Sequence, residues 1–557
     1  MNSASCLHEA AEREVEELTT QITALEVKRE ELTNNFRRVN HTIRSLQSRV
    51  AQIKNDAVPI SRLPSDVLEI IFDESRRVLF RWTGFRRPLP IEVQLSHVCR
   101  RWRQVALNTP SLWNTLRIPI LHRESAIRTY LHRCNQCPLS VHLGPQLSDR
   151  RMMDVITSEL MPRIGQFREL ILDTEDRQEL HVLLSHLVNT AAPSLQRLKI
   201  TSNDPVRGQG SYPPIEIFKR GAPLLSDVRL SALPITLPQA AVSTLHFDPL
   251  PGPGIPLPRS HLLSIITPVA SSLTVLYLKG FVSGFHEEPG SAPVVLPALR
   301  ELVVHDHAMI HGFNVFRNIS APSLRFFTLY ALKRQALSSI HKFMTRTSPD
   351  QFHGLCSLHY IDCDMDDDLD IYLPHATSTL THLSVSLGSH THLMRLLSNS
   401  DKQAALHRTA PLWPRLRTLT FHVASPWSQD RDDVESDEED ELPPDIVLLL
   451  DVIQLRKAVG AELELLRLEG PHARAFHDDL ALALMKSQLQ VNMEVLPGLS
   501  PGNDSQLLSS GDWAYSGLFY GSEYRAHLYR KMQSGPHGQH HFHWGSVPRG
   551  PGSPLSP

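Results

Sequence analysis

The sequence predicts an α/β protein in three parts: a long N-terminal helix, a small helical bundle, and a curved solenoid of parallel strands and helices. Three observations predict it. An apolar heptad pattern fills a proline-free segment, two apolar helical patterns follow, and a short strand motif then recurs eleven times. The chain has 557 residues, enough for a large core, and 41 prolines, more than average usage of about 5% would give.

The composition excludes several classes of protein. The 56 Lys and Arg residues nearly balance the 59 Asp and Glu residues, so no overall field favours nucleic acid or an anionic membrane. Six scattered cysteines are too few for a disulfide framework. The N-terminus lacks a secretory signal pattern, and no 18-residue apolar run occurs. We therefore expect a cytoplasmic or nuclear protein.

Residues 9–57 are predicted to form a coiled coil. Residues 1–58 contain neither proline nor glycine, and apolar residues recur there at alternating steps of three and four, interrupted only by Arg29. The series comprises Val15, Leu18, Ile22, Leu25, Leu32, Phe36, Val39, Ile43, Leu46, Val50 and Ile53. A strict a/d pattern over six heptads is typical of a left-handed supercoil. One long helix folded back on the next domain is the alternative, and a homo-oligomer through this segment remains open.

Residues 59–120 are predicted to form a small helical bundle. Leu63-Pro64-Ser65 suits a helix start, because proline fits the first turn and serine can cap it. Apolar residues then recur at helical spacing, first at Val67, Leu68, Ile71 and Phe72, and after a basic insert at Leu95, Val98, Trp102 and Val105. The arginines of this region accompany no base-reading motif, so a solvated face is favoured over nucleic-acid binding.

The order Leu63-Pro64-x-x-Val67-Leu68-x-x-Ile71-Phe72, Val98-Cys99-Arg100-x-Trp102-Arg103 and Pro110-x-Leu112-Trp113 closely resembles the F-box. The arrangement is similar to that of fungal F-box proteins with a preceding coiled coil and a following leucine-rich region. The insert at 73–94 is longer and more basic than a compact F-box needs.

The resemblance implies docking on the Skp adaptor of an SCF-type cullin-RING ubiquitin ligase, with the rest of the chain capturing a protein substrate. The residues that the motif assigns to docking are Leu63, Pro64, Val67, Leu68, Ile71, Phe72, Val98, Cys99 and Trp102. An apolar helical face needs burial, and a partner groove would supply it. Packing of these residues against the repeats is the alternative.

Residues 121–495 are predicted to form an irregular leucine-rich-repeat solenoid. The pattern apolar-x-x-apolar-x-apolar recurs eleven times, mostly near the 20–29-residue period of such repeats. Its copies begin at Phe167, Leu195, Leu225, Val242, Leu273, Leu299, Leu324, Leu358, Leu380, Leu416 and Leu463. Stacked strand-plus-helix units make a curved sheet with one concave face. We expect the residues between the second and third apolar positions to be exposed there as a substrate face: His246, Tyr277, Thr328, Tyr360, Ser384 and Thr420.

Other motifs predict no metal, cofactor or catalytic site. Cys134-x-x-Cys137 lacks a second ligand pair, and the acidic run 362–370 lacks the glycine and final glutamate of a calcium loop. No G-x-S-x-G, P-loop or H-E-x-x-H occurs, so a non-enzymatic protein is expected.

The remaining segments are predicted from composition. The acidic insertion 428–443, in which Ser436 suits an acid-directed kinase, is predicted to be disordered. The aromatic-rich segment 496–532 is predicted to cap the solenoid, and the tail 533–557 to be disordered, its four histidines included.

Five prolines, Pro193, Pro223, Pro297, Pro322 and Pro414, each stand two residues before a strand motif, and we interpret them as punctuation between repeats.

The sequence thus favours a substrate receptor of a ubiquitin ligase. A coiled-coil and solenoid scaffold that does not engage the ligase is the alternative, and the target is not readable from the sequence.

Overall fold

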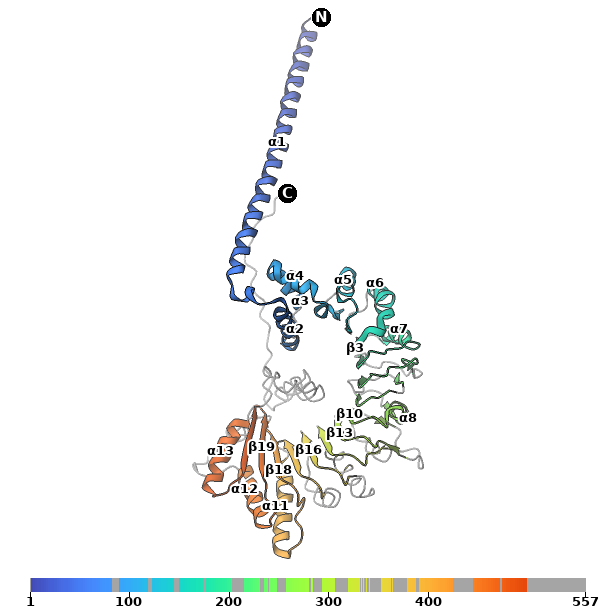
Figure 1. Cartoon of the computed structure of the whole chain (residues 1–557), viewed down its shortest axis with the longest axis vertical. Helices are drawn as coiled ribbons and strands as arrows, with labels where there is room; N and C mark the ends of the chain where they lie inside the picture. The colour runs from blue at the N-terminus through green and yellow to red at the C-terminus, as the bar shows by residue number, and fades with distance from the viewer. Residues whose placement is uncertain are drawn as a thin grey trace. The chain divides into compact units, whose positions relative to one another are not determined.

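The computed structural model shows an α/β protein with a long N-terminal helix and a large parallel sheet flanked by helices (Figure 1). The chain divides into two compact units, residues 1–116 with 120–137, and residues 117–119 with 138–557. The structure describes residues 2–497 except 83–89, 119–122, 145–149, 175–176, 203–214, 231–234, 239, 248–256, 280–281, 284–292, 306–318, 331, 333, 335–336, 338–339, 341–351, 362, 364–377, 387–389, 424–443 and 471–472.

Helix α1 (Asn2–Ala57) confirms the long helix predicted for the N-terminus. It ends just before Pro59, where the chain turns into the short 3₁₀ helix η1 (Pro59–Arg62). None of the side chains described on α1, from residue 12 onward, is buried. The a/d stripe is therefore exposed along the described length of α1.

The first unit continues as a helical bundle. Its elements are α2 (Ser65–Trp82), α3 (Ile91–Val98), α4 (Arg100–Asn108), the 3₁₀ helix η2 (Pro110–Trp113) and α5 (Glu124–Cys134). The apolar pattern from Leu95 to Val105 thus spans two helices, which meet at Cys99 in extended conformation. Part of the basic insert at 73–94 continues α2, and the compact unit reaches residue 137 rather than ending near 120.

Aromatic side chains fill the core of this bundle. The rings of Phe72 and Trp102 lie 4.9 Å apart and join α2 to α4. Trp113 is buried, donates from Nε1 to the carbonyl of Ala106 at 2.8 Å, and meets Tyr130 of α5 edge-on at 5.0 Å. Residues 59–137 therefore carry a hydrophobic core of their own.

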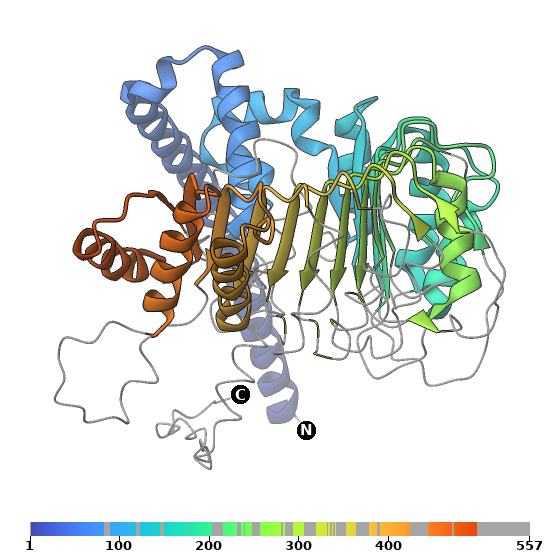
Figure 2. The same cartoon turned by 90° about the horizontal axis from the view of Figure 1, so that it is seen from below.

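The second unit is built on one parallel sheet, whose strand order follows the sequence from β2 to β20. Figure 2 shows these strands side by side. Its strands are β2 (Leu139–Leu143), β3 (Phe167–Thr174), β4 (Arg197–Ser202), β6 (Asp227–Leu230), β8 (Thr244–Phe247), β10 (Val275–Lys279), β13 (Glu301–His305), β15 (Phe326–Tyr330), β16 (Ser357–Ile361), β17 (His382–Ser386), β18 (Thr418–His422), β19 (Leu465–Gly470) and β20 (Asn492–Pro497). The short β1 (Thr115–Arg117) crosses the boundary between the units.

Helices and short strands connect the strands of the sheet. The helices are α6 (Arg150–Val155), η3 (Ile156–Leu160), η4 (Met161–Gln166), α7 (Arg177–Leu187), α8 (Arg259–Ile266), η5 (Thr267–Val269), α11 (His390–His407), α12 (Pro444–Ala458) and α13 (Ala473–Lys486). Three small parallel pairs join β5 (Ile215–Glu216) to β7 (Ile235–Thr236), β9 (Leu257–Pro258) to β11 (Val282–Ser283), and β12 (Val294–Val295) to β14 (Ile319–Ser320).

All eleven predicted copies of the motif fall on strands of this sheet, but one was misaligned. The sheet pairs Leu358 with Leu383 and Phe327, so Leu358 is the second apolar position of its copy and the first is Leu355. The misalignment arose because Ile361, the last residue of β16, and Cys363 beyond it also fit the apolar spacing. The sequence motif did not identify strands β2 and β20, because neither has an apolar residue at the first position of the motif.

The five prolines interpreted as punctuation between repeats each lie in a tight turn directly before a strand. In the turn before β4, the amide of Leu195 donates to the carbonyl of Ala192 at 3.2 Å, with Pro193 between them at the second turn position. The same bond joins Leu225 to Ala222, Leu299 to Leu296, Leu324 to Ala321 and Leu416 to Trp413. Proline favours this position because its fixed φ matches a type I or II turn. One tight turn therefore precedes each of these strands.

No helix in the described part of the chain is both long and apolar enough to cross a bilayer. Four predictions lie on residues outside the described ranges: the acidic run 362–370, apart from its buried Cys363, the insertion 428–443, all but the first two residues of the cap segment 496–532, and the tail 533–557.

Candidate protein-interaction surfaces

The nine predicted docking residues divide into an exposed and a buried group. Pro64 and Val98 are exposed, Val98 to 57% of its surface, and Leu63, Val67, Ile71, Cys99 and Trp102 are partly exposed. Leu68 and Phe72 are fully buried in the bundle. Their assignment to a docking face was wrong, because on a short helix the residues that hold the bundle together share the same helical spacing as those that face outward.

The structure exposes one further large apolar side chain on α2. Ile70 on α2 is 69% exposed, although the motif does not include it. A large apolar side chain exposed on the outer side of an amphipathic helix is the signal that could have found it. We refer to Leu63, Pro64, Val67, Ile70, Ile71, Val98 and Trp102 together as the apolar set of the bundle.

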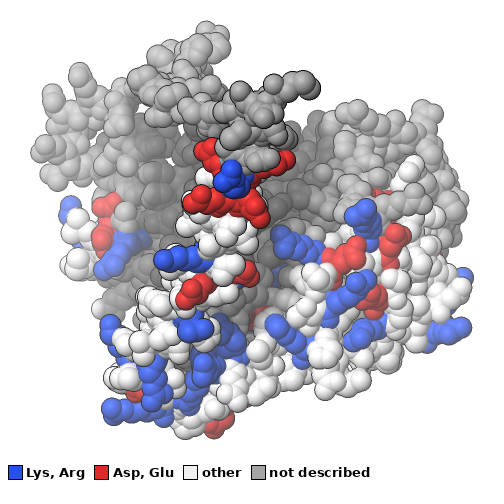
Figure 3. Space-filling model, turned by 90° about the horizontal axis from the view of Figure 1, so that it is seen from above, with Lys and Arg blue, Asp and Glu red and all other residues white. Residues whose placement is uncertain are grey.

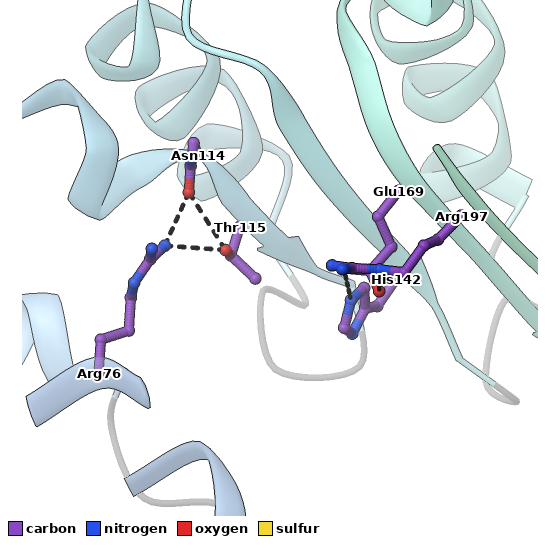
Figure 4. A network of polar contacts seen from close by, with 6 residues as sticks. All are labelled: Arg76, Asn114, Thr115, His142, Glu169 and Arg197. Carbon is purple, nitrogen blue, oxygen red and sulfur yellow. Dashed lines mark hydrogen bonds and ion pairs between the residues drawn. The ribbon is translucent and has the colours of Figure 1, made fainter. Parts of the chain in front are cut away.

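Polar contacts fix the backbone that carries this set. The guanidinium of Arg101 on α4 donates to the carbonyls of Ser61 and Leu63, which ties the segment before α2 to α4. Farther along α2, Arg76 donates to Asn114 at 2.7 Å and to Thr115 at 3.0 Å (Figure 4). The apolar set is therefore presented on a braced scaffold rather than on a free helix.

The second candidate surface is one face of the large sheet. Parallel pairing in register places the same strand position of every strand on one line across the sheet. The residue between the second and third apolar positions of each strand forms such a line, which we call the middle row: His142, Ile171, Lys199, Arg229, His246, Tyr277, Val303, Thr328, His359, Ser384, Thr420, Arg467 and Glu494.

Of the six residues predicted to be exposed on a substrate face, five lie in the middle row, and all six are buried. His246, Tyr277, Thr328, Ser384 and Thr420 lie in the middle row, but each is buried. Tyr360 lies outside it, because the register places His359 at that position and turns Tyr360 to the leucine side. Strands are about 4.8 Å apart, so side chains in a row cover their neighbours, and short Ser and Thr side chains are hidden first.

The N-terminal part of this face is charged. Glu169 on β3 accepts from Arg197 at 3.0 Å and lies 3.5 Å from the Nε2 of His142 (Figure 4). Burial alone would raise the pKa of Glu169, but the hydrogen bonds from His142 and Arg197 outweigh it and lower that pKa to about 2. Glu169 is therefore a fixed anion over the whole physiological range.

The central part of the face is aromatic and apolar. The rings of His246 and Tyr277 lie 5.2 Å apart on β8 and β10, and Val303 and Thr328 continue the row. Burial, reinforced by the charge of Arg229, lowers the pKa of His246 to about 3. Its Nε2 has no hydrogen-bond partner among the residues that the structure describes, and neither has the hydroxyl of Thr328.

The C-terminal part of the face is a cluster of imidazoles and hydroxyls, which we call the histidine cluster. It consists of Ser357, His359, His382, Ser384, Thr420 and His422 on β16 to β18. Its contacts join Ser357 to His359 at 2.7 Å, His382 to Thr420 at 2.9 Å and Ser384 to His422 at 2.6 Å. The rings of His359 and His382 lie 5.2 Å apart.

These histidines are neutral at pH 7. Burial, with repulsion from neighbouring His382 and His422, lowers the pKa of His359 to about 3. Burial and Arg467 lower the pKa of His382 to about 4, and burial and His382 do the same for His422. The cluster therefore offers uncharged donors and acceptors, suited to polar groups of a peptide rather than to a phosphate.

Part of the histidine cluster has the connectivity of a catalytic triad. The Oγ of Ser384 meets Nε2 of His422, whose Nδ1 lies 3.3 Å from the Oε2 of Glu469. Acyl transfer also needs an accessible nucleophile and amide donors aimed at the oxyanion. Ser384 has no exposed surface, and its strand is paired on both sides, which occupies the amides around it. The arrangement therefore holds the face together and does not support hydrolysis.

Sequence reasoning missed the histidine cluster. Thirty histidines in the chain make chance groupings common, so their number carried no signal. The usable signal was positional: His359, His382 and His422 occupy alternate strand positions, on the face opposite the leucines, in three successive repeats. Only the correct register of β16 places His359 in that group.

The Cys134-x-x-Cys137 motif forms a turn after α5, neither cysteine is in a disulfide, and the thiol of Cys134 donates to the carbonyl of Leu131 at 3.3 Å. No cluster of metal-binding side chains occurs among the residues that the structure describes. A comparison with protein-family models found no matching family, and a search of curated proteins found no significant relative.

Proposed function

We propose that this protein is the substrate-recognition subunit of an SCF-type ubiquitin ligase. Residues 59–120 would act as an F-box that docks on the Skp adaptor, and the sheet of the second unit would act as an irregular leucine-rich-repeat solenoid that captures a target protein. The observation that carries the proposal is a braced helical bundle with the ordered F-box pattern, on which Pro64, Ile70 and Val98 are exposed.

Two further features support it. Monomeric proteins rarely leave large apolar side chains grouped on a small helical bundle unless a partner covers them. A long parallel sheet of repeated strands is the type of architecture that repeat proteins use for binding. Neither feature needs a catalytic residue, a metal or a cofactor.

The proposed mechanism is proximity. Docking at one unit and capture at the other would hold a target close to the ubiquitin-loaded component of a cullin-RING ligase. Tethering raises the effective concentration of the reacting groups to the millimolar range or above without any new chemistry. The chain would therefore act as an adaptor and not as an enzyme.

The test is binding of the purified full-length protein to the Skp adaptor by biolayer interferometry. The Leu63→Ala/Pro64→Ala variant and the single variant Val98→Asp are expected to lower the affinity at least tenfold, because both alter the apolar set. Leu406→Asp is the matched control, since Leu406 is 78% exposed on α11 and lies in the other unit. Phe72→Ala is unsuitable, because it would empty the core of the bundle.

Absence of binding by the parent protein would contradict the proposal and favour the alternative, a coiled-coil and solenoid scaffold that is not engaged with a ligase. If the parent binds, partners recovered after proteasome inhibition are expected to be targets. Their recovery should fall when His382 and Arg467 on the polar face are replaced by alanine and should not change with Leu406→Asp.

A further inference from the structure

The exposed stripe of α1 leaves the largest unpartnered apolar surface in the described part of the chain. Its eleven apolar a/d residues from Val15 to Ile53 are each at least 45% exposed. A shallow groove on the helix, lined by Ile43, Leu46, Gln47, Val50, Ala51 and Lys54, lies between successive a and d residues. Such grooves are the holes that knobs of a second helix fill in a coiled coil.

The charges of α1 are divided between its two halves. Residues 12–31 contain seven glutamates against three basic residues: Glu12, Glu14, Glu16, Glu17, Glu26, Glu30 and Glu31, with Arg13, Lys28 and Arg29. Residues 32–57 contain five basic residues against one acid: Arg37, Arg38, Arg44, Arg49 and Lys54, with Asp56. Figure 3, which views the molecule from the side where the N-terminus lies in Figure 1, shows a group of acidic side chains on that side.

We infer that α1 pairs with α1 of a second copy of this chain in an antiparallel coiled coil. In this orientation the acidic half of each helix lies along the basic half of the other. A parallel pair would align acid with acid and base with base. Electrostatic complementarity of this kind selects orientation and partner, because like charges side by side cost affinity.

The core position of Arg29 gives an independent reason for the same orientation. It is the only charged residue in the a/d stripe. In a parallel pair in register, Arg29 would face Arg29 of the other copy across the seam, which buries two like charges together. If the antiparallel pair is centred on residue 34, a and d residues at positions that sum to 68 oppose each other, and Arg29 faces Val39.

The same register matches apolar residues along the rest of the seam. Val15 opposes Ile53, Leu18 opposes Val50, and Ile22 opposes Leu46, so the N-terminal residues of one helix supply the knobs for the groove on the other. At the centre, Leu32 opposes Phe36. The seam runs from Val15 to Ile53, so the Ile53 residues of the two helices lie roughly 57 Å apart along the axis, for 38 steps at 1.5 Å each.

This inference does not depend on the proposed ligase function. If both hold, one assembly carries two docking bundles at opposite ends of a helical rod, each with its own solenoid. Such a receptor can engage two sites on one target or two copies of a target, which raises avidity without a stronger single contact.

The test uses the full-length protein with Cys6 replaced by serine. Light scattering after gel filtration should give a dimer. Leu18→Cys and Val50→Cys variants, one with a size tag, are then mixed and oxidised. The antiparallel register predicts a disulfide between Leu18→Cys and Val50→Cys chains and none between two Leu18→Cys chains. A monomer, a higher oligomer, or cross-linking of Leu18→Cys with itself overturns the inference.

Charge exchange provides a second readout that does not depend on cysteine chemistry. Glu12→Lys/Glu14→Lys and Arg49→Glu/Lys54→Glu change positions that flank the seam. In this register Glu12 and Glu14 of one helix lie level with Lys54 of the other, and Glu14 lies little more than a turn from Arg49. Each double variant should dimerise about tenfold more weakly, because it sets like charges of the two halves side by side. The variant with all four changes should regain affinity. Failure of the fourfold variant to recover would contradict the antiparallel orientation.

Discussion

The most buried ionic contact that the structure describes lies between α11 and α12. Asp401 and Arg456 are both fully buried, 3.6 Å apart. The guanidinium donates to the carbonyls of Ala461, Leu412 and Trp413 at 2.8–3.2 Å, whereas the Asp401 oxygens accept no hydrogen bond. Burial raises the pKa of Asp401 to about 6, and the charge of Arg456 only partly offsets it.

Asp401→Asn tests this unequal pair. The folded protein binds the Asp401 proton more tightly than the unfolded chain, so the stability that protonation adds is present at low pH and is lost as the pH rises from about 4 through about 6. Urea unfolding should therefore give the variant a higher free energy of unfolding, relative to the parent, at pH 8 than at pH 4.5. The difference between the two pH values should be up to about 3 kcal/mol.

Asp451→Asn is the control, because Asp451 pairs with Lys402 between the same helices while half exposed. Its effect should be small at both pH values, since exposed ion pairs contribute about 0–1 kcal/mol. If the difference in the free energy of unfolding between Asp401→Asn and its parent does not change with pH, the raised pKa of Asp401 is contradicted.

The alignment of single residues on β16 also decides which side chain lies on the predicted substrate face. The spacing of Leu358, Ile361 and Cys363 fits the repeat motif as well as that of Leu355, Leu358 and Tyr360. The two alignments differ by three residues, and an odd shift moves a side chain to the other face of a strand, so the choice decides whether Tyr360 or His359 faces the row. Only pairing with β15 and β17 settles it.

At the scale of elements, the end of β19 is held close to β18. Gly470 has φ +122°, and a Cβ there would lie 2.5 Å from the carbonyl oxygen of Val423. The amide of Val423 donates to the carbonyl of Glu469 at 2.7 Å, which keeps the two backbones in contact.

Gly470→Ala is expected to destabilise the protein by about 2 kcal/mol or more, because alanine meets both an unfavourable φ and a backbone clash. Gly165→Ala in η4 is the matched change, since a Cβ there meets nothing within 4 Å. It should be close to neutral. Thermal unfolding followed by circular dichroism compares the stability of the two variants. Equal losses of stability would contradict the explanation by the backbone clash and the positive φ at Gly470.

The turns before the strands are elements that the sequence defines almost completely. Proline fixes φ at the second turn position, and the leucine three residues after the start of the turn begins the motif, so local chemistry alone predicts them. The division of residues 91–108 into α3 and α4 was not predictable in this way. It depends on Cys99, whose Sγ accepts from the amide of Trp102 at 3.4 Å, a weak cap that periodicity does not reveal.

At the scale of the whole molecule, each unit has its own large buried tryptophan. Trp113 contacts Ala106 and Tyr130 of the first unit, and Arg133 lies 4.3 Å above its ring. Trp413 is equally buried in the second unit, where its carbonyl accepts from Arg456.

Trp113→Ala is expected to cost roughly 3–5 kcal/mol, as large-to-small changes in a core do, and to lower amide exchange protection within residues 59–137. Trp413→Ala should lower protection near α11, α12 and β18 instead. Hydrogen exchange followed by mass spectrometry separates the two patterns. Loss of protection throughout both units in either variant would contradict independent cores.

The sequence by itself determined the order of the parts: the long helix, the bundle and the repeated strands, because each follows from a local period or a turn residue. The tertiary structure decided which members of those patterns are buried. It placed Leu68 and Phe72 in a core, covered the middle row, and gathered three histidines from three repeats. The physical reason is that periodicity fixes the side of an element on which a residue lies, whereas burial, ion pairing and pKa depend on neighbours far away in the chain.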